Sequence, residues 1–443
     1  MFSIFNTLTT KKAEFIPINK EDIRIYFCGP TVYNELHIGN YRAALVADLL
    51  SKTLKGIYPK VTFVSNITDI DDKIIKEASK QSCSINELTQ KYYKKFMNDA
   101  DILGISKPDL QPFATDYVDE MIDYIQTLLK NNSAYEISGN VLFEVNKFSN
   151  YGCLSGRCIE EQDSGARVKI EDYKKNPNDF TLWKPSLANE PGWESPWGYG
   201  RPGWHLECSV MSESVLGVPF DIHGGGNDLK FPHHDNEIAQ TCGFHNSSDP
   251  TCFAKYWVHN GFLNLANEKM SKSLGNVVYI DDLLKEFKGN EIRLALLSTH
   301  YRQPIPWSLN LLKQAASVAR KISRFTSSHT TKSKFFPGSN IGKAILDDLN
   351  TPKALAIMQS LITNPKKFDI NQEISTFRYI FEGSKQDLSL SKEDQDKINQ
   401  LIKLRLKARE NGDYQTADKI RDELNKMNVS IKDKNGKTEW EIL

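Results

Sequence analysis

Four short runs of β-branched and aromatic residues, each followed at once by glycine or polar residues, constrain the fold of this chain most strongly. They lie at Ile23–Cys28, Val61–Val64, Pro219–Ile222 and Tyr256–His259. Apolar residues at helical spacing over 42–56 separate the first two runs, which predicts a β-α-β unit with parallel strands. Ligands of such a sheet bind beyond the carboxyl ends of its strands. We therefore predict a doubly wound nucleotide-binding fold with one crevice lined by Cys28, Thr68, His223 and Asn260.

The predicted sheet is interrupted by a segment with its own helix, over 117–130, and its own hairpin, over 134–145. After residue 309 the pattern becomes helical. Two amphipathic helices, over 397–410 and 413–427, then precede a hairpin that turns at Asn435-Gly436. The chain is therefore expected to have an α/β core, a helical region and a small α+β end.

Two short motifs predict an anionic nucleotide ligand. His37-Ile-Gly39-Asn40 lies between the first strand and its helix, where backbone N–H groups and the helix dipole favour phosphate. Lys269-Met-Ser-Lys272-Ser273 places two lysines three residues apart in a small loop, as neutralising a triphosphate requires. Alone, the first motif also fits a helix-capping turn and the second a solvated loop. Their occurrence together, in this order, favours a nucleotide site.

Five longer blocks accompany the two motifs. They are Phe27–Tyr33 (FCGPTVY), Asn66–Lys73 (NITDIDDK), Gly203–Ser209 (GWHLECS), Asp221–Leu229 (DIHGGGNDL) and Phe231–Glu237 (FPHHDNE). With these blocks, in family order, the chain resembles the cysteinyl-tRNA synthetase family of class I aminoacyl-tRNA synthetases from end to end. It departs from the class at Asn40, where the first motif usually ends in histidine.

The resemblance implies an α/β fold: a class I Rossmann-type catalytic domain with an inserted connective subdomain, then an α-helical bundle and a small C-terminal α+β anticodon-binding module. We expect six segments. They are the first half of the Rossmann fold (1–114), the connective insertion (115–197), the second half (198–262), the KMSKS-loop and stem-contact region (263–308), the helical tRNA-binding bundle (309–395) and the anticodon-binding module (396–443). The insertion is too short for a large editing domain.

The resemblance also implies which residues bind ATP, which enters with Mg²⁺ as a substrate. These are His37, Gly39, Asn40, Asp228, Lys269 and Lys272. His37, Lys269 and Lys272 are the implied catalytic residues, because the lysines stabilise the charge that develops when the amino acid carboxylate attacks the α-phosphate. For Asp228 two interpretations stay open, a contact with the ribose hydroxyls and a cap on the next helix.

The same resemblance implies a zinc site. Its ligands are Cys28, Cys208, His233 and Glu237. His233 and Glu237 are four residues apart after Pro232, so one helical face presents both side chains. Two sulfurs, one nitrogen and one oxygen suit tetrahedral Zn²⁺, of which we expect one per chain. Without the resemblance, buried core positions and a helix cap would explain the same residues.

Zinc would explain how the enzyme rejects other amino acids. A substrate thiolate is a further soft ligand, whereas the hydroxyl of serine binds zinc poorly and the methyl of alanine does not bind it. Packing differences of one methylene supply only about 1–3 kcal/mol of discrimination. By resemblance, the cysteine pocket is completed by Gly29, Thr68, Trp204 and His223. Cys153 and Cys158 are interpreted as free thiols.

The charge distribution indicates an RNA partner. Lys plus Arg and Asp plus Glu both number 56, so the formal net charge is zero. Nevertheless, the stretch from Arg293 to Lys343 has nine basic residues and no acidic one. Such a run predicts phosphate contacts, and the resemblance implies that the RNA is tRNA(Cys).

No apolar run reaches the roughly 18 residues that span a bilayer. The N-terminal residues do not follow the order of a secretory signal, and the seven cysteines do not form a disulfide pattern. We therefore expect a cytoplasmic protein with no membrane partner. The resemblance implies a monomer.

These observations together predict a zinc-dependent cysteine–tRNA ligase, which forms cysteinyl adenylate from ATP and L-cysteine, releases pyrophosphate and transfers the amino acid to the 3′ end of tRNA(Cys). Alternatives are a relative that joins cysteine to an amino sugar, a methionine-type synthetase and a catalytically silent RNA-binding paralogue. The first would need no basic stretch or C-terminal module. Cys28 disfavours the second, and His37, Lys269 and Lys272 disfavour the third.

Overall fold

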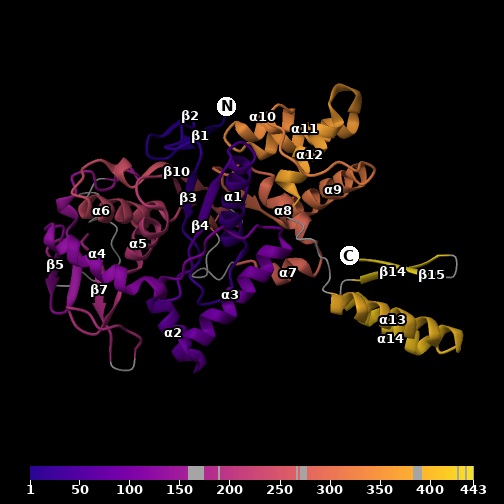
Figure 1. Ribbon diagram of the computed structural model, residues 1–443, viewed down its shortest axis with the longest axis horizontal. Coiled ribbons are helices and arrows are strands. Elements are labelled where there is room, and N and C mark those ends of the chain that lie inside the picture. The colour runs from indigo at the N-terminus through magenta and orange to yellow at the C-terminus, as the bar shows by residue number, and fades with distance from the viewer. Residues whose placement is uncertain are drawn as a thin grey trace. The chain divides into compact units, whose positions relative to one another are not determined.

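The computed structural model describes residues 1–157, 174–187, 190–265, 268–269, 277–382, 392–426, 429–434 and 437–442. It divides into two compact units, Met1–Ser384 and Lys385–Leu443 (Figure 1). The helices of the first unit are α1 (Ile38–Lys55), α2 (Asp72–Gln81), α3 (Ile85–Ile102), α4 (Val118–Lys130), α5 (Trp204–Leu216), α6 (Asp235–Phe244), α7 (Ile280–Leu284), α8 (Gly289–Leu297), α9 (Leu309–Thr326), α10 (Asn340–Leu346), α11 (Thr351–Thr363) and α12 (Ile370–Phe381). Its strands are β1 (Ser3–Asn6), β2 (Lys11–Glu14), β3 (Ile23–Phe27), β4 (Val61–Ser65), β5 (Ala134–Ile137), β6 (Asn140–Phe143), β7 (Phe180–Pro185), β8 (Gly200–Pro202), β9 (Phe220–Gly226), β10 (Ala254–Asn260), β11 (Leu263–Leu265), β12 (Glu268–Lys269) and β13 (Ile305–Trp307).

A parallel four-stranded sheet in the order β10-β9-β3-β4 forms the centre of the first unit. These are the four predicted strands, and α1 contains the helix predicted between the first two. The strands are largely buried, because helices cover both faces of the sheet, with α1 on one side and α5 and α6 on the other (Figure 1). Their parallel order brings all four carboxyl ends to one edge.

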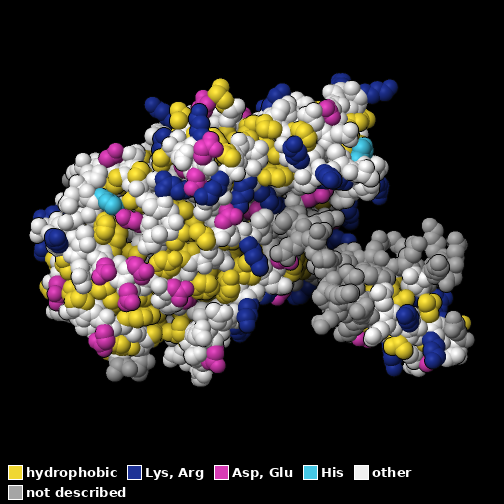
Figure 2. All heavy atoms as spheres, in the orientation of Figure 1, with side chains coloured by type: hydrophobic (Ala, Val, Ile, Leu, Met, Phe, Trp, Pro, Cys, Tyr) yellow, Lys and Arg dark blue, Asp and Glu magenta, His cyan; other side chains and the backbone are white. Residues whose placement is uncertain are grey.

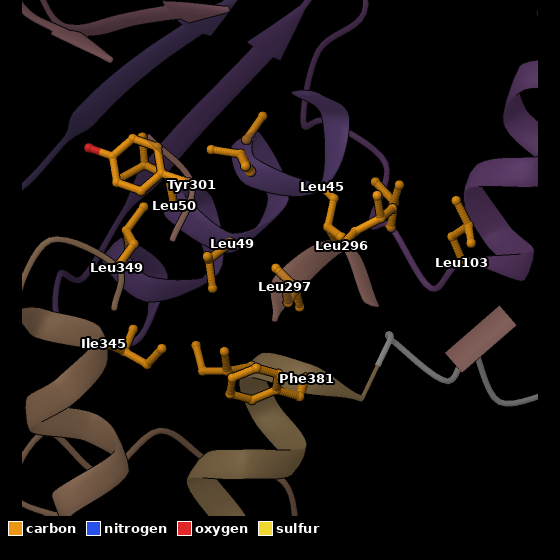
Figure 3. Packing of buried hydrophobic residues seen from close by; sticks show 14 of the residues in the cluster. Leu45, Leu49, Leu50, Leu103, Leu296, Leu297, Tyr301, Ile345, Leu349 and Phe381 are labelled. Carbon is orange, nitrogen blue, oxygen red and sulfur yellow. The ribbon is translucent and has the colours of Figure 1, made fainter. Parts of the chain in front are cut away.

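Alternate side chains of the strands enter two hydrophobic cores. In β3, Ile23 and Ile25 belong to one core and Tyr26 to the other. The first core lies between the sheet, α1 and helices α8 to α12. Figure 3 shows leucines of α1 facing Leu297 of α8 and Phe381 of α12. The second core joins the sheet to α4, α5, α6 and the insertion.

The segment predicted as the insertion contributes β5, β6 and β7 to an antiparallel sheet in the order β5-β6-β7-β8, whose last strand lies beyond the predicted boundary at residue 197. The predicted hairpin corresponds to β5 and β6, and the predicted helix to α4. Strands β7 and β8 were not predicted, since β8 is the tripeptide Gly-Arg-Pro. Cys158 lies outside the described residues, whereas Cys153 is a half-buried free thiol.

Two further small sheets were not predicted. Strands β1 and β2 form an N-terminal hairpin. Strand β11 pairs in parallel with β13 and antiparallel with β12, so the segment after β10 returns toward the helical region.

The second unit consists of α13 (Lys392–Glu410), α14 (Tyr414–Lys426) and a hairpin of β14 (Val429–Lys434) and β15 (Lys437–Ile442). Ile398, Ile402, Leu424 and Val429 form its small core. The unit therefore has the helix-helix-hairpin order that the sequence predicts. Among the residues described, no helix has the length and apolar character needed to cross a membrane.

A buried ion pair joins α8 to α1. Arg293, 1% exposed, donates from Nη2 to Asp48 Oδ2 at 3.1 Å and from Nη1 to the carbonyls of Leu103 and Gly104. Lys52 Nζ also lies 3.1 Å from Asp48 Oδ2. Burial alone would raise the pKa of Asp48, but Lys52 and Arg293 hold it below its ordinary value of 3.8. The expectation that Arg293 contacts phosphate is therefore wrong, because its guanidinium is used inside the core.

Asp48→Asn is expected to lower the free energy of unfolding at neutral pH by about 3 kcal/mol, since it leaves the Arg293 guanidinium buried without its carboxylate. Because the folded pKa of Asp48 is depressed, its contribution is present above 3.8 and is lost as the pH falls through the folded pKa. Urea unfolding of both proteins at pH 7 and pH 2.5 measures this. The difference between them should shrink at the lower pH, and an unchanged difference would contradict the assignment.

Candidate active site and metal centre

A cavity of about 400 Å³ opens at the carboxyl edge of the parallel sheet. Its wall includes residues at or just after the carboxyl ends of all four strands, namely Cys28, Ser65, Gly226 and Asn260, and the start of α1. The predicted crevice is therefore present with Cys28 and Asn260 in its wall, but Thr68 and His223, which were also expected to line it, are buried and do not. Seven of the predicted site residues line it: Cys28, Gly29, His37, Gly39, Asn40, Trp204 and Asp228.

The first motif forms the N-terminus of α1. His37 is the N-cap, and its Nδ1 accepts the N–H of Gly39 at 3.1 Å, while Asn40 Oδ1 accepts the N–H of His37 at 3.1 Å. Because Nδ1 is an acceptor here, a neutral His37 carries its proton on Nε2. The first turn of α1 contains no acidic residue, so the helix end favours an anion. Asn40 therefore stabilises the turn of the first motif through its own side chain. This local role does not require the histidine that the class usually has at this position.

The second motif is only partly described. Lys269 lies in β12, where its backbone pairs with Asn264 of β11, and Lys272 lies outside the described residues. The chain then returns to the first motif, since Ile38 donates its N–H to the carbonyl of Val278 at 2.9 Å. The segment that follows the lysine motif is therefore bonded directly to the start of α1.

Four predicted metal ligands converge beneath the cavity. Cys28 Sγ lies 3.5 Å from Cys208 Sγ and 3.4 Å from Glu237 Oε1, and His233 Nε2 lies 2.9 Å from Glu237 Oε1. All four donor atoms are within 4.8 Å of one another. Cys28 follows β3, Cys208 lies in α5, and the other two lie in and just before α6. Only Cys28 also belongs to the cavity wall.

The donor set fits zinc. Glu237 is fully buried and Cys208 and His233 are 2% exposed, so water does not solvate the carboxylate or a thiolate there. Two thiolates, an imidazole and a carboxylate are zinc ligands, and a bound cation would compensate their negative charge in this buried place. Second contacts orient the imidazole: His233 Nδ1 lies 2.9 Å from His205 Nδ1, and its ring stacks on Trp204.

The two thiols of the cluster differ in acidity. Burial and the neighbouring Cys208 raise the pKa of Cys28 well above its usual range, whereas the hydrogen bond from Cys28 lowers the pKa of Cys208 to about 6. Metal binding requires both thiols to lose their protons. The Cys208 thiol would therefore need little change in protonation to act as a ligand, whereas Cys28 would have to release its proton.

One histidine that the sequence analysis did not assign to the site, His234, adjoins the cluster. His234 Nε2 lies 3.4 Å from Cys28 Sγ, and its Nδ1 lies 2.8 Å from His259 Nε2. His234 and His223 form a second four-ligand set with Cys28 and Glu237. The only sequence signal for this second set was the adjacent pair His233-His234. The pair alone does not tell which of the two rings faces the sulfur atoms.

The predicted cysteine-pocket residues separate into two layers. Gly29 and Trp204 line the cavity, and Trp204 is 38% exposed. A Cβ on Gly29 would lie 1.6 Å from the carbonyl oxygen of Asn66, so this position excludes side chains. Thr68 and His223 are buried behind the wall.

The hidden layer makes polar contacts of its own. Thr68 Oγ1 donates to Glu207 Oε2 at 2.7 Å, and His223 Nε2 lies 2.6 Å from Glu237 Oε2. Glu207 therefore orients Thr68 behind the cavity wall, and His223 orients Glu237 within the metal-ligand cluster. Glu207 was missed because an acidic residue inside a helix gives no sequence signal of burial.

Asp228 lies in the loop after β9 and is exposed at the cavity wall. The next helical turn, η4 (Lys230–His234), has Leu229 as its N-cap and no side-chain cap. Of the two interpretations of Asp228, the cap on the next helix is therefore the less favoured.

Most of the predicted basic stretch is on the surface. Arg302 forms an ion pair with Asp348, because its Nη2 lies 2.8 Å from Asp348 Oδ2. The exposed basic residues are Lys313, Arg320, Lys321, Arg324, Lys332, Lys334 and Lys343, and Arg320 Nε also lies 3.4 Å from Glu291 Oε1. On the face seen in Figure 2, Lys and Arg side chains are spread over the part formed by α9 to α12, with few acidic ones between them.

Comparisons with known proteins cover the whole chain. The model for the catalytic domain of class I (C) tRNA synthetases matches residues 14–317, and that for the cysteinyl-tRNA ligase anticodon-binding domain matches residues 394–440. The cysteine–tRNA ligase of Pelagibacter ubique is 45% identical over 451 residues, covering 99% of this chain and 98% of the relative. That of Rhodospirillum rubrum is 42% identical over 460 residues, covering 99% and 98%.

Solved structures share the fold at much lower identity. Methionyl-tRNA synthetase of Mycobacterium tuberculosis is 12% identical with a TM-score of 0.57, covering 81% of this chain and 89% of that one. The LeuRS of an Agrobacterium radiobacter complex with tRNA is 10% identical with a TM-score of 0.58, covering 83% and 84%. The architecture is therefore that of class I synthetases.

Proposed function

Because the chain belongs to the cysteine–tRNA ligase family of class I aminoacyl-tRNA synthetases, we propose that its cavity selects L-cysteine through a zinc-bound thiolate and activates it with ATP. One observation carries this proposal: Cys28 is both a member of the four-ligand cluster and part of the cavity wall. When bound, Zn²⁺ supplies a soft Lewis acid that accepts a substrate thiolate. Cys28, Cys208, His233 and Glu237 would hold it.

The remaining residues position the two anionic reactants. The N-terminus of α1 and His37 bind the phosphates of ATP, and the Gly29 backbone with Trp204 confines the amino acid beside them. Lys269 and Lys272 neutralise the charge that passes to pyrophosphate. No protein nucleophile is required, because alignment and charge neutralisation account for carboxylate attack on the α-phosphate.

The C-terminal unit favours tRNA over an amino sugar as the acceptor. It matches the anticodon-binding model, and a ligase for a small acceptor needs no such module. The exposed lysines and arginines of α9 supply a second contact surface, with Lys313, Arg320 and Arg324 on one helical face at i, i+7 and i+11.

Pyrophosphate exchange with cysteine, serine and methionine, followed by charging of transcribed tRNAs, tests this function. Exchange that depends on cysteine and charging of tRNA(Cys) are expected. Exchange with methionine would identify a different synthetase, cysteine activation without charging would favour the amino sugar ligase, and no exchange would favour the silent paralogue. Serine activation by a zinc-containing preparation would contradict selection by zinc.

Reversing three charges on α9, as Lys313→Glu with Arg320→Glu and Arg324→Glu, is expected to weaken tRNA binding while cysteine-dependent exchange stays unchanged. Each lost phosphate contact lowers the slope of log affinity against log salt by about one. Filter binding between 50 and 200 mM salt measures the slope. Reversal of three charges elsewhere, at Lys11, Lys20 and Lys130, which are exposed lysines outside α9, is the control, and an equal loss there would remove α9 from the interface.

A further inference from the structure

The chain contains a second close pair of thiols outside the metal cluster. Cys242 Sγ in α6 lies 3.4 Å from Cys252 Sγ in η5 (Pro250–Cys252), nearly the separation of Cys28 and Cys208. Neither thiol lines the cavity. The pair therefore has no part in the proposed function.

The surroundings of the two pairs differ. Over the described part of the chain, every group of three or more possible metal ligands includes Cys28 and Glu237, and none includes Cys242 or Cys252. The neighbouring Asp249 offers its backbone carbonyl, 3.5 Å from Cys242 Sγ. Two thiols without a third ligand are poorly suited to a metal but can join to each other.

We propose that Cys242 and Cys252 are an oxidation site, at which a peroxide or a low-molecular-weight disulfide converts the two thiols into an intramolecular disulfide. The sulfur atoms must approach from 3.4 Å to a bond length of about 2.05 Å, a movement within reach of side-chain rotation. Only nine residues separate them, so the new ring closes locally.

The two thiols have distinct roles in this chemistry. Cys252 is half-buried, while Cys242 is 1% exposed. The hydrogen bond between the two sulfur atoms lowers the pKa of Cys252, which favours the thiolate at the more accessible position. Reactive cysteines of this type are accessible, acidic and adjacent to a second thiol.

The reaction balances with hydrogen peroxide as oxidant. The Cys252 thiolate attacks one peroxide oxygen, the O–O bond breaks, and the departing hydroxide takes up a proton to leave as water, giving a sulfenic acid. The Cys242 sulfur then attacks the sulfenic sulfur, loses its proton, and a second water leaves. Both thiols are oxidised and the peroxide is reduced to two waters.

The crosslink would fasten two elements of the active site region. Helix α6 carries Glu237, and η5 leads directly into β10, which ends at Asn260 in the cavity wall. The end of α6 is already held by stacking of Phe244 on Tyr124. The disulfide would thus add a covalent link between α6 and the segment that leads into β10, two elements that packing alone holds together otherwise.

Trypsin provides a direct assay, because both cysteines lie in one peptide, Phe231–Lys255, with no other cysteine. The full-length, zinc-loaded protein is treated with hydrogen peroxide or oxidised glutathione, denatured, alkylated and digested. The peptide is expected to lose two hydrogen atoms and to resist alkylation until reduced. Alkylatable thiols should fall from seven to five.

Single variants separate the roles. Cys242→Ser should leave Cys252 as a lasting glutathione adduct, Cys252→Ser should leave Cys242 unmodified, and Cys83→Ser, a half-buried thiol elsewhere, should still form the disulfide. Full alkylation of the peptide after oxidation, or an adduct that persists on Cys252 of the wild-type protein, would overturn the proposal. Neither outcome depends on aminoacylation.

Discussion

Cys208→Ser is expected to lower the kcat/KM for cysteine in pyrophosphate exchange by at least about 100-fold, with bound zinc falling from about one ion per chain to a small fraction. Even changes to the outer partners of metal ligands cost roughly 10- to 100-fold, and this substitution removes a ligand itself. Affinity for ATP should stay within about twofold, because Cys208 is 2% exposed and is not part of the cavity wall. Metal analysis, exchange kinetics and calorimetric ATP titration measure the three quantities.

Cys83→Ser is the matched control, since it removes a thiol that belongs to neither the cluster nor the cavity. It should keep both zinc and activity. A Cys208→Ser protein that retained zinc and still activated cysteine in preference to serine would refute the four-ligand assignment. Retention of zinc alone would favour the alternative set with His223 and His234.

Arg42→Met is expected to lower the free energy of unfolding by between about 3 and 5 kcal/mol and to reduce exchange activity beyond the unfolded fraction. The Arg42 guanidinium in α1 is 1% exposed and donates to five backbone carbonyls. These belong to Gly261, Phe262, His300, Tyr301 and Gln303. Methionine fills a similar volume but leaves the carbonyls without this donor.

Activity should fall because two of the residues that Arg42 holds, Gly261 and Phe262, line the cavity. Burial lowers the pKa of Arg42 to about 10, and no carboxylate forms an ion pair with it in the part of the chain that is described. The change is measured by urea unfolding and by exchange well below the midpoint. Lys55→Met, on the exposed end of the same helix, should change stability by less than about 1 kcal/mol. An equal effect of both substitutions would contradict this role.

The parallel sheet was predictable because each strand combines a β-branched run with an abrupt polar end, a local pattern that burial on both faces imposes. Strand β8 was not, since Gly-Arg-Pro pairs only because β7 is already in place beside it. Arg293 shows the limit of charge counting. Arg293 belongs to a basic run in the sequence. Its partner in the structure, however, is Asp48, which accepts its hydrogen bond and lies 245 residues earlier in the chain.

The sequence predicted which types of residue belong to the site. It did not predict which residues line the cavity and which are buried behind its wall. Cys28 and Cys208 are so dispersed that only the family blocks connected them, and local spacing joined only His233 to Glu237. The burial of Thr68 behind the wall, its bond to Glu207 and the approach of His234 to Cys28 depend on how α5 and α6 pack on β3. No periodicity within one element contains that information.

The separation of Cys28 and Cys208 by 180 residues has a consequence for how the enzyme is maintained in a cell. An ion held by both, and by Glu237 of α6, would tie the two halves of the catalytic domain across the insertion and stabilise the native state by mass action. Molecules that lost the ion would then lose selectivity and folding stability together. The enzyme molecules that no longer select cysteine would then be the ones most readily degraded by proteases. Metal occupancy would in this way couple translational fidelity to protein turnover.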